Sequence, residues 1–278
     1  MPDPLGPTNP NVSPFWTSRE IERKMSTCPA FPLRDNEASV SESSGEVMQK
    51  AFGFLCHLGY GAKVTIRNLG MAVVFCAGAV QAEPVTIAAL GDSLTQGYGL
   101  PEKDGFVPQM QAWLDAQGAD VVMINAGVSG DTTAGGLSRV AWTLTPDVDA
   151  MIVALGGNDF LRGLAPEESR ANIKGILDYA QAQGVKVLLV GLEVGTNYGP
   201  DYKAQFDALY PELAAEYDVP LYPTFFAGLL DTGDIAAARA AYIQPDGLHP
   251  NAEGVSKIVE AMGPAVLALA QSARNAGL

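Results

Sequence analysis

The feature that most constrains the fold is a regular alternation, from residue 84 onward, of short apolar runs with longer amphipathic stretches. The short runs are rich in β-branched residues and lack polar alternation, which is typical of strands that are covered on both faces. The longer stretches place apolar residues three and four positions apart, as on one face of a helix. This alternation predicts an α/β fold, with a mainly parallel sheet between two layers of helices.

The same pattern gives the expected elements. Five strands are expected at 85–90, 120–124, 150–155, 185–190 and 219–222. The main helices are expected at 106–116, 132–144, 166–184, 202–217 and 251–273. The third helix begins at Pro166, a residue favoured in a first turn, and stops at Gly184. No repeat or linker interrupts residues 83–278, so we interpret them as one domain.

The charge balance excludes several classes of function. The chain has 278 residues, with 17 Lys and Arg against 31 Asp and Glu, and a net charge of −14. Residues 83–278 carry the whole imbalance, with 10 basic and 24 acidic side chains. Such a domain repels phosphates, so neither nucleic acid nor an anionic membrane surface is expected as a partner.

The first 82 residues differ in character from the rest. Residues 1–62 are rich in Pro, Ser and Asn and show no sustained apolar period, so we expect a disordered or mis-assigned extension. Residues 63–82 combine a basic flank, a 12-residue apolar run and small residues at a cleavage site, which is typical of a secretory signal. The run is too short for a stable membrane anchor, which takes about 20 residues; a buried core helix is the alternative.

The predicted leader has two consequences. A secretory signal belongs at the start of a chain, so we hypothesise an internal translation start at Met48 or near Val64. The processed protein would then be periplasmic or secreted. Residues 83–278 contain no cysteine, which fits an oxidising compartment because no thiol is present to mispair.

Two glycine-rich motifs follow the first two predicted strands, at the sheet edge where open α/β folds bind ligands. Ser93 of the GDSL sequence lies on a loop suited to a nucleophile, with a helix-capping serine as the alternative. Gly127 and Gly130 leave backbone N–H groups accessible beside a helix start, as an oxyanion or phosphate site requires. An ordinary turn capped by Asp131 is the alternative there.

Two further motifs supply an amide and an acid–imidazole pair. Asn158 of GGND offers uncharged donors that suit a developing oxyanion, although an asparagine in a positive-φ turn is the alternative. Asp246 and His249 of DGLHP share a short loop between two prolines, where a carboxylate can fix the tautomer of an imidazole. His249 is the only histidine of residues 83–278, so a zinc site lacks its preferred ligands. No metal or other cofactor is expected.

These four motifs, in this order, resemble the SGNH (GDSL-type) hydrolase family over about residues 85–265. The matching blocks read GDSL, GVSGDT, GGND and DGLHP. The stretches GDTTAGGLSR and LGGNDFLRGL are most similar to the periplasmic thioesterase I/protease I/lysophospholipase branch, which includes arylesterases. The resemblance implies a flavodoxin-like, three-layer α/β/α sandwich with a five-stranded sheet.

The resemblance also implies roles for individual residues. Ser93 would be the nucleophile, His249 the base and Asp246 the acid that orients it. The backbone N–H groups of Ser93 and Gly130 and the side chain of Asn158 would form the oxyanion hole. A substrate-side loop would follow GGND, with residues Phe160, Leu161 and Leu164.

We therefore expect a serine esterase or thioesterase that hydrolyses small-molecule acyl esters, such as arylesters, lysophospholipids or acyl thioesters. Two alternatives remain open on the sequence alone. One is a carbohydrate O-acetylesterase that uses the same machinery. The other is a non-catalytic binding protein that keeps the fold.

Overall fold

The computed structural model describes residues 83–230 and 235–276. The predicted extension at 1–62 and the predicted signal at 63–82 lie outside the described residues. Within the described residues, no helix combines the length and the apolar character that crossing a membrane requires.

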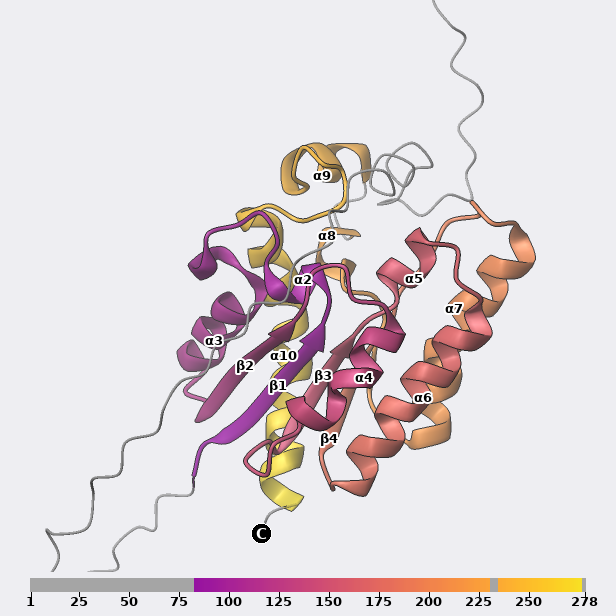
Figure 1. Ribbon diagram of the computed structural model, residues 1–278. Coiled ribbons are helices and arrows are strands. Elements are labelled where there is room, and N and C mark those ends of the chain that lie inside the picture. Colours follow the sequence, from indigo (N-terminus) through magenta and orange to yellow (C-terminus); the bar gives the residue numbers. More distant parts are fainter. Residues whose placement is uncertain (1–82, 231–234, 277–278) are drawn as a thin grey trace, which may run out of the picture. The chain divides into compact units, whose positions relative to one another are not determined.

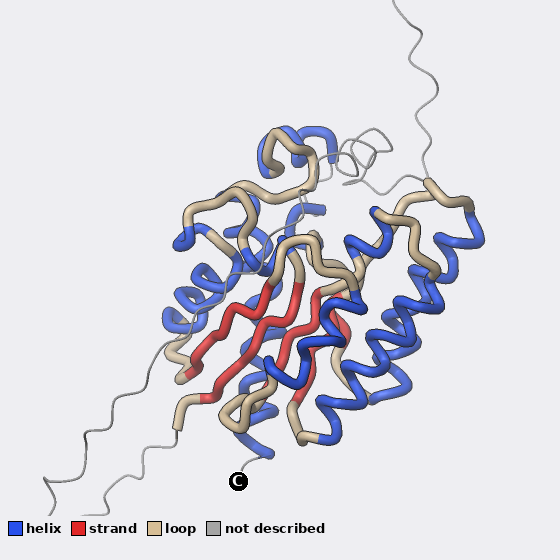
Figure 2. The backbone as a smooth tube through the Cα atoms, viewed as in Figure 1, coloured by secondary structure: helices blue, strands red, loops and turns tan. Residues whose placement is uncertain are grey.

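The centre of the domain is one sheet of five parallel strands (Figures 1 and 2). Its strands are β1 Val85–Gly91, β2 Val121–Gly127, β3 Ala150–Ala154, β4 Lys186–Val190 and β5 Leu221–Tyr222. Their order across the sheet is β2-β1-β3-β4-β5, which is the flavodoxin-like order. The carboxyl ends of all five strands therefore meet at one edge of the sheet, as the sequence pattern predicts.

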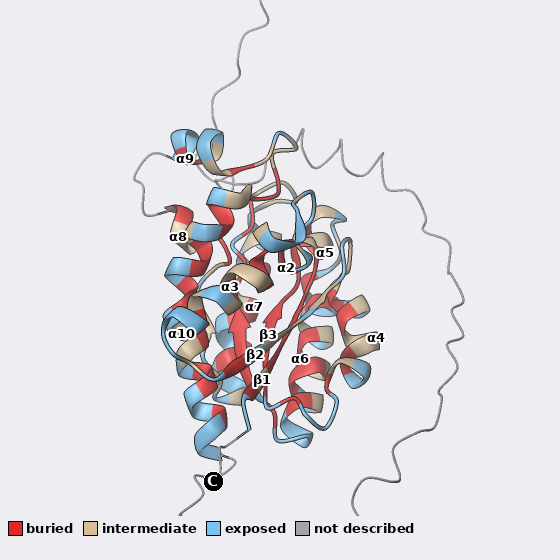
Figure 3. Cartoon of the chain, turned by 90° about the vertical axis from the view of Figure 1, so that its left-hand side faces the viewer, coloured by how far each residue is buried: buried red, intermediate tan, exposed pale blue. Residues whose placement is uncertain are grey.

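Helices cover both faces of this sheet. The helices of the described residues are α2 Ser93–Gln96, α3 Phe106–Ala116, α4 Thr133–Thr143, α5 Gly157–Leu161, α6 Pro166–Ala182, α7 Pro200–Tyr217, α8 Ala227–Leu230, α9 Ile235–Tyr242 and α10 Ala252–Ala276. A short 3₁₀ turn, η1, spans Glu102–Asp104. Helices α4, α6 and α7 pack on one face, and α3, α8 and α10 on the other (Figures 1 and 3). The result is the predicted three-layer sandwich.

Burial follows the layers. Every residue of β3 is buried, as expected for a strand in the middle of a sheet with helices on both sides. Strand β2 lies at the sheet edge and is more exposed, with Val122 at 45%. In Figure 3 the buried surfaces of α10 and α6 both face the sheet. Helix α3 buries Val107, Met110 and Leu114, whereas Trp113 is only partly buried.

Four helices were not expected from the sequence: α2, α5, α8 and α9. Three of them have only four or five residues, which is too short to show a helical period. Two of these short helices, α2 and α5, begin at the carboxyl ends of β1 and β3. They therefore carry residues at the edge where the site was predicted.

Candidate active site

The structure brings Ser93, His249 and Asp246 into one hydrogen-bonded chain. The Nε2 atom of His249 lies 2.7 Å from the Oγ atom of Ser93, although the two residues are 156 positions apart in the sequence. The Nδ1 atom of the same ring lies 2.6 Å from Oδ2 of Asp246. A hydroxyl, an imidazole and a carboxylate in this order make up the geometry of a nucleophile, a base and an orienting acid.

Ser93 is held by the helix that begins at it. Strand β1 ends at Gly91, Asp92 caps the next helix, and Ser93 is the first residue of α2. The Oδ1 atom of Asp92 accepts a hydrogen bond of 3.0 Å from the N–H of Leu94. The capping residue is therefore Asp92, not Ser93, and the serine hydroxyl remains available to His249.

Asp246 is tied to the loop that carries His249. Its Oδ1 atom accepts the backbone N–H groups of Leu248 and His249 at 3.0 and 3.1 Å, while Oδ2 faces the ring. Burial alone would raise the pKa of Asp246. The hydrogen bonds from the His249 ring and from the two N–H groups outweigh burial, so the pKa of this carboxyl lies well below its usual range. Asp246 therefore stays ionised beside an imidazole that is only 6% exposed.

Gln244 links the histidine loop to the turn after Ser93. Its side-chain Nε2 donates to the carbonyl oxygens of Tyr98 at 2.9 Å and Pro250 at 2.8 Å. Its backbone N–H donates to the carbonyl oxygen of His249 at 2.7 Å. Gly99 permits this approach, because a Cβ atom there would lie 2.4 Å from Oε1 of Gln244. The glutamine thus joins the two loops that bring Ser93 and His249 together.

An aromatic ring covers the imidazole. The ring of Tyr98 packs on that of His249 with a centroid distance of 4.6 Å and an interplanar angle of 37°. Tyr98 is itself 46% exposed, so it lies between the imidazole and solvent. The sequence analysis identified neither Gln244 nor Tyr98, since contacts between residues so distant in the chain leave no local pattern.

Gly130 and Asn158 lie next to one another beside this chain of groups. Gly130 has φ of +85°, a conformation that glycine adopts without strain, in the turn between β2 and α4. Nδ2 of Asn158 donates to the carbonyl oxygen of Asp131 at 2.9 Å and lies 3.4 Å from Oδ2 of Asp92. Asn158 is part of helix α5, so it does not occupy a positive-φ turn.

The turn that carries Gly130 is fixed from two sides. Arg139 donates to Asp131 Oδ2 at 2.6 Å and to the carbonyl oxygens of Ala126 and Gly91 at 2.7 and 2.9 Å. It therefore joins the ends of β1 and β2 to the turn. Thr132, not Asp131, caps α4, because its Oγ1 accepts the N–H of Gly135.

Asp159, the neighbour of Asn158, holds the start of helix α4, which follows this turn. Its side chain is fully buried and accepts from the backbone N–H and the hydroxyl of Thr133, and from the hydroxyl of Ser169. These bonds connect α5 to the start of α4 and to α6. The GGND motif indicated this position, but no sequence pattern predicts that the aspartate joins three helices.

Asp92 is the other buried acid of the site. Burial, together with the nearby carboxylates of Asp159 and Asp131, raises the pKa of Asp92 to about 7, although the N–H of Leu94 opposes the shift. It therefore changes charge in the pH range where a histidine base operates.

The predicted substrate-side loop is attached to helix α7. Phe160 is fully buried and contacts Tyr198, Tyr202 and Phe206, whereas Leu161 and Leu164 are partly exposed. The hydroxyl of Tyr202 donates to the carbonyl oxygen of Leu164 at 2.8 Å, and that of Tyr198 to Leu161 at 3.3 Å. Of the three residues predicted to line this loop, only the two leucines therefore present side-chain surface.

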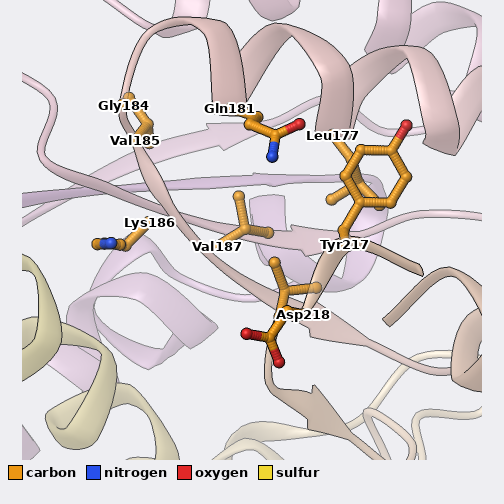
Figure 4. Close-up of a pocket in the computed structure, with 9 residues that line it drawn as sticks. Leu177, Gln181, Gly184, Val185, Lys186, Val187, Tyr217 and Asp218 are labelled. Atoms are coloured by element: carbon orange, nitrogen blue, oxygen red, sulfur yellow. The ribbon is translucent and has the colours of Figure 1, made fainter. Parts of the chain in front are cut away.

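One pocket lies away from these residues. It is formed where α6 and α7 end and β4 and β5 begin, with Leu177, Lys186 and Tyr217 in its lining (Figure 4). Ser93 follows the carboxyl end of β1, whereas this pocket lies at the amino ends of β4 and β5, on the opposite side of the sheet. Within the part of the chain that the structure describes, no group of three or more His, Cys, Asp or Glu side chains is placed to hold a metal ion.

Comparison with known proteins identifies the family. Residues 89–256 match the GDSL-like Lipase/Acylhydrolase family. Esterase TesA of Pseudomonas aeruginosa is 36% identical over 185 residues, which cover 66% of this chain and 89% of the relative. Thioesterase 1/protease 1/lysophospholipase L1 of Escherichia coli is 33% identical over 178 residues, covering 64% and 81%.

A solved structure gives the same result. AlinE4, an SGNH-hydrolase family esterase, is 43% identical and has a TM-score of 0.54, with 66% of this chain and 95% of that chain covered. The family match spans more than half of the chain and contains the serine, glycine, asparagine, aspartate and histidine described above. The chain therefore belongs to the GDSL-like lipase/acylhydrolase family of SGNH hydrolases and is an enzyme that hydrolyses ester bonds.

Proposed function

We propose that the chain is a serine esterase and thioesterase that uses Ser93, His249 and Asp246 as a catalytic triad. The observation that carries this proposal is the continuous chain of contacts from Ser93 Oγ through both ring nitrogens of His249 to Asp246, with distances of 2.7 and 2.6 Å. His249 accepts the serine proton as Oγ attacks the acyl carbonyl. The ionised Asp246 holds the ring and stabilises the imidazolium that forms.

The tetrahedral oxyanion is stabilised by the backbone N–H groups of Ser93 and Gly130 and by the side-chain amide of Asn158. His249 then returns the proton to the departing alcohol or thiol, which leaves an acyl-serine. A water molecule, deprotonated by His249, attacks this acyl-enzyme. His249 then returns the proton to Ser93 Oγ as the bond to the acyl group breaks and the acid is released. Every step is carried by side chains and backbone groups of the chain itself.

The proposed substrates are small acyl esters and thioesters, including arylesters and lysophospholipids. The names of the relatives support this range, and the partly exposed Leu161 and Leu164 give one side of the site an apolar surface for an acyl chain. We further propose that residues 63–82 direct export and that the enzyme works in the periplasm or outside the cell.

The test combines one variant with two measurements. Ser93→Ala should lower kcat by at least about 10³-fold, and by up to about 10⁶-fold if the triad acts as a unit. The wild-type enzyme should react with a fluorophosphonate probe, and Ser93→Ala should not. Turnover near the wild-type level in this variant would remove Ser93 from the mechanism.

A panel of substrates defines the specificity. Acyl p-nitrophenyl esters and acyl thioesters of increasing chain length are compared with acetylated sugars. Turnover of the acetylated sugars alone would favour a carbohydrate O-acetylesterase. Failure of both the panel and the probe would favour a binding protein.

A further inference from the structure

Arg162 is hydrogen-bonded to two of the three residues of the proposed oxyanion hole. Its Nη2 atom donates to the carbonyl oxygen of Gly130 at 2.8 Å. Its backbone N–H donates to the carbonyl oxygen of Asn158 at 3.1 Å, at the end of helix α5. Residues four apart lie on the same side of a helical turn, so Asn158 and Arg162 are neighbours in space as well. The guanidinium therefore lies beside two residues of the proposed oxyanion hole.

The charge of this guanidinium is not neutralised by the protein. Arg162 is exposed and forms no ion pair with the described residues, whereas five other basic residues do. Those five are Arg139, Arg170, Lys174, Lys203 and Arg274. Three lysines, Lys103, Lys186 and Lys257, also form no ion pair with the described residues. What distinguishes Arg162 is its contact with two residues of the proposed oxyanion hole.

The acids of the site are engaged elsewhere. Asp131 pairs with Arg139, and Asp246 contacts His249. Asp159 is fully buried among hydroxyl and N–H donors, and Asp92 is buried at the start of α2. A guanidinium has five N–H donors, and the bond to Gly130 occupies one of them. The remaining donors suit the planar, two-oxygen contact that Arg makes with carboxylates and phosphates.

We propose that Arg162 binds an anionic group, a carboxylate or a phosphate, that the substrate carries close to its scissile ester. The enzyme is then selective for anionic acyl esters over neutral ones of the same size. This inference rests on the proposed function, because it needs Gly130 and Asn158 to bind the ester oxygen. It adds a substrate class that the triad alone does not specify.

Two matched substrate pairs test the inference on the full-length enzyme. One pair is 4-acetoxybenzoate and its neutral methyl ester. The other is a lysophosphatidic acid and the monoacylglycerol with the same acyl chain. For each pair, the ratio of kcat/KM for the anionic ester to kcat/KM for the neutral ester is measured. Intrinsic reactivity cancels when this ratio is compared between wild type and variant.

In Arg162→Gln the ratio should fall by about three- to tenfold, the range expected for one solvent-accessible charged contact. Arg162→Lys should recover part of the loss, and high ionic strength should reduce the wild-type preference. Lys186→Gln is the matched control: it removes an exposed cation beside the pocket of Figure 4, at the opposite edge of the sheet, and should leave the ratio unchanged.

The pair that responds identifies the anion as a carboxylate, a phosphate or both. An unchanged ratio in Arg162→Gln for both pairs would overturn the inference, and an equal loss on anionic and neutral esters would show that Arg162 only holds the Gly130 turn. Hydrolysis that persists in Ser93→Ala would instead overturn the proposed function. If hydrolysis depends on Ser93 but the ratio is the same in wild type and Arg162→Gln, only the proposed selectivity for anionic esters would be overturned.

Discussion

Asn158 presents its amide nitrogen, and not its amide oxygen, toward two acceptors. The carbonyl oxygen of Asp131 and the carboxyl oxygen of Asp92 both lie on the nitrogen side, at 2.9 and 3.4 Å. An amide can turn over at little cost unless its neighbours distinguish the two ends. These acceptors therefore fix the donor end of the side chain at the site, next to Gly130.

This arrangement predicts the result of removing the amide. Asn158→Ala should lower kcat on the order of 10²–10³-fold with a smaller change in KM, because the donor acts mainly on the oxyanion of the transition state. Asn158→Asp should be at least as poor, since a carboxylate repels the oxyanion. Steady-state kinetics on a short acyl ester measures both. A kcat in Asn158→Ala within a factor of a few of wild type would contradict the role.

Asp92 predicts a dependence of stability on pH. Its pKa is raised to about 7 in the folded protein, against 3.8 for an ordinary aspartate. As the pH rises from about 4 to about 7, the unfolded chain loses this proton while the folded chain keeps it, so folding loses stability over that window. Asp92→Asn keeps a good helix cap but has no proton to lose.

The difference in Tm between Asp92→Asn and wild type should therefore shift in favour of the variant between pH 4 and pH 7. Thermal unfolding followed by circular dichroism at several pH values measures it. Other titrating groups are common to both proteins and cancel in the difference. A difference in Tm that is constant across this window would refute the assignment.

At the scale of elements, the site depends on how two loops meet. The turn after α2 and the loop before α10 are joined by Gln244, which contacts Tyr98, His249 and Pro250. A β-bridge between Ile243 and Pro250 closes the loop before α10, but it does not join this loop to the turn after α2. The distance between Ser93 and His249 is therefore set partly by a side chain that takes no part in the chemistry.

Gln244→Ala should lower kcat about tenfold or more, because small displacements of reacting groups are costly. Gln244→Glu should not restore activity, since a carboxylate cannot donate to the two carbonyl oxygens. Gln111→Ala is the matched control. Gln111 also joins a helix to a strand through the backbone of Val121 and Met123, but at the amino end of β2. A similar loss of activity in both variants would indicate a general loss of stability.

The sequence predicted the long elements well and the short ones poorly. Helix α3 has the expected bounds, 106–116, and all five strands appear near the expected positions, because apolar periodicity reports burial directly. Helices α2 and α5 are too short for a period, yet they carry Ser93 and Asn158. The proposed site residues were predicted from four short motifs, whereas the contacts of Gln244, Tyr98 and Arg162 exist only in the folded chain.

At the scale of the whole molecule, the sheet, its helices and the site all lie within residues 83–276. Residues 83–278 carry the net charge of −14 and contain no cysteine. The absence of cysteine agrees with export, which the apolar run before residue 83 predicts independently.

Amino-terminal sequencing of the exported protein tests this expectation. The processed chain should begin near Glu83, just before β1. A chain that keeps residues 63–82 after export would contradict the predicted signal. Replacing the apolar run with a polar one should hold the protein in the cytoplasm, as measured by fractionation.

The order of the site residues along the chain has one more consequence. Ser93, Gly130 and Asn158 all precede α6, while Asp246 and His249 arrive only in the last 33 residues, on a single loop. Under the proposed mechanism, a chain still on the ribosome thus contains its nucleophile long before its base and its acid. It would hydrolyse no ester until the last 33 residues have been made and His249 has reached Ser93.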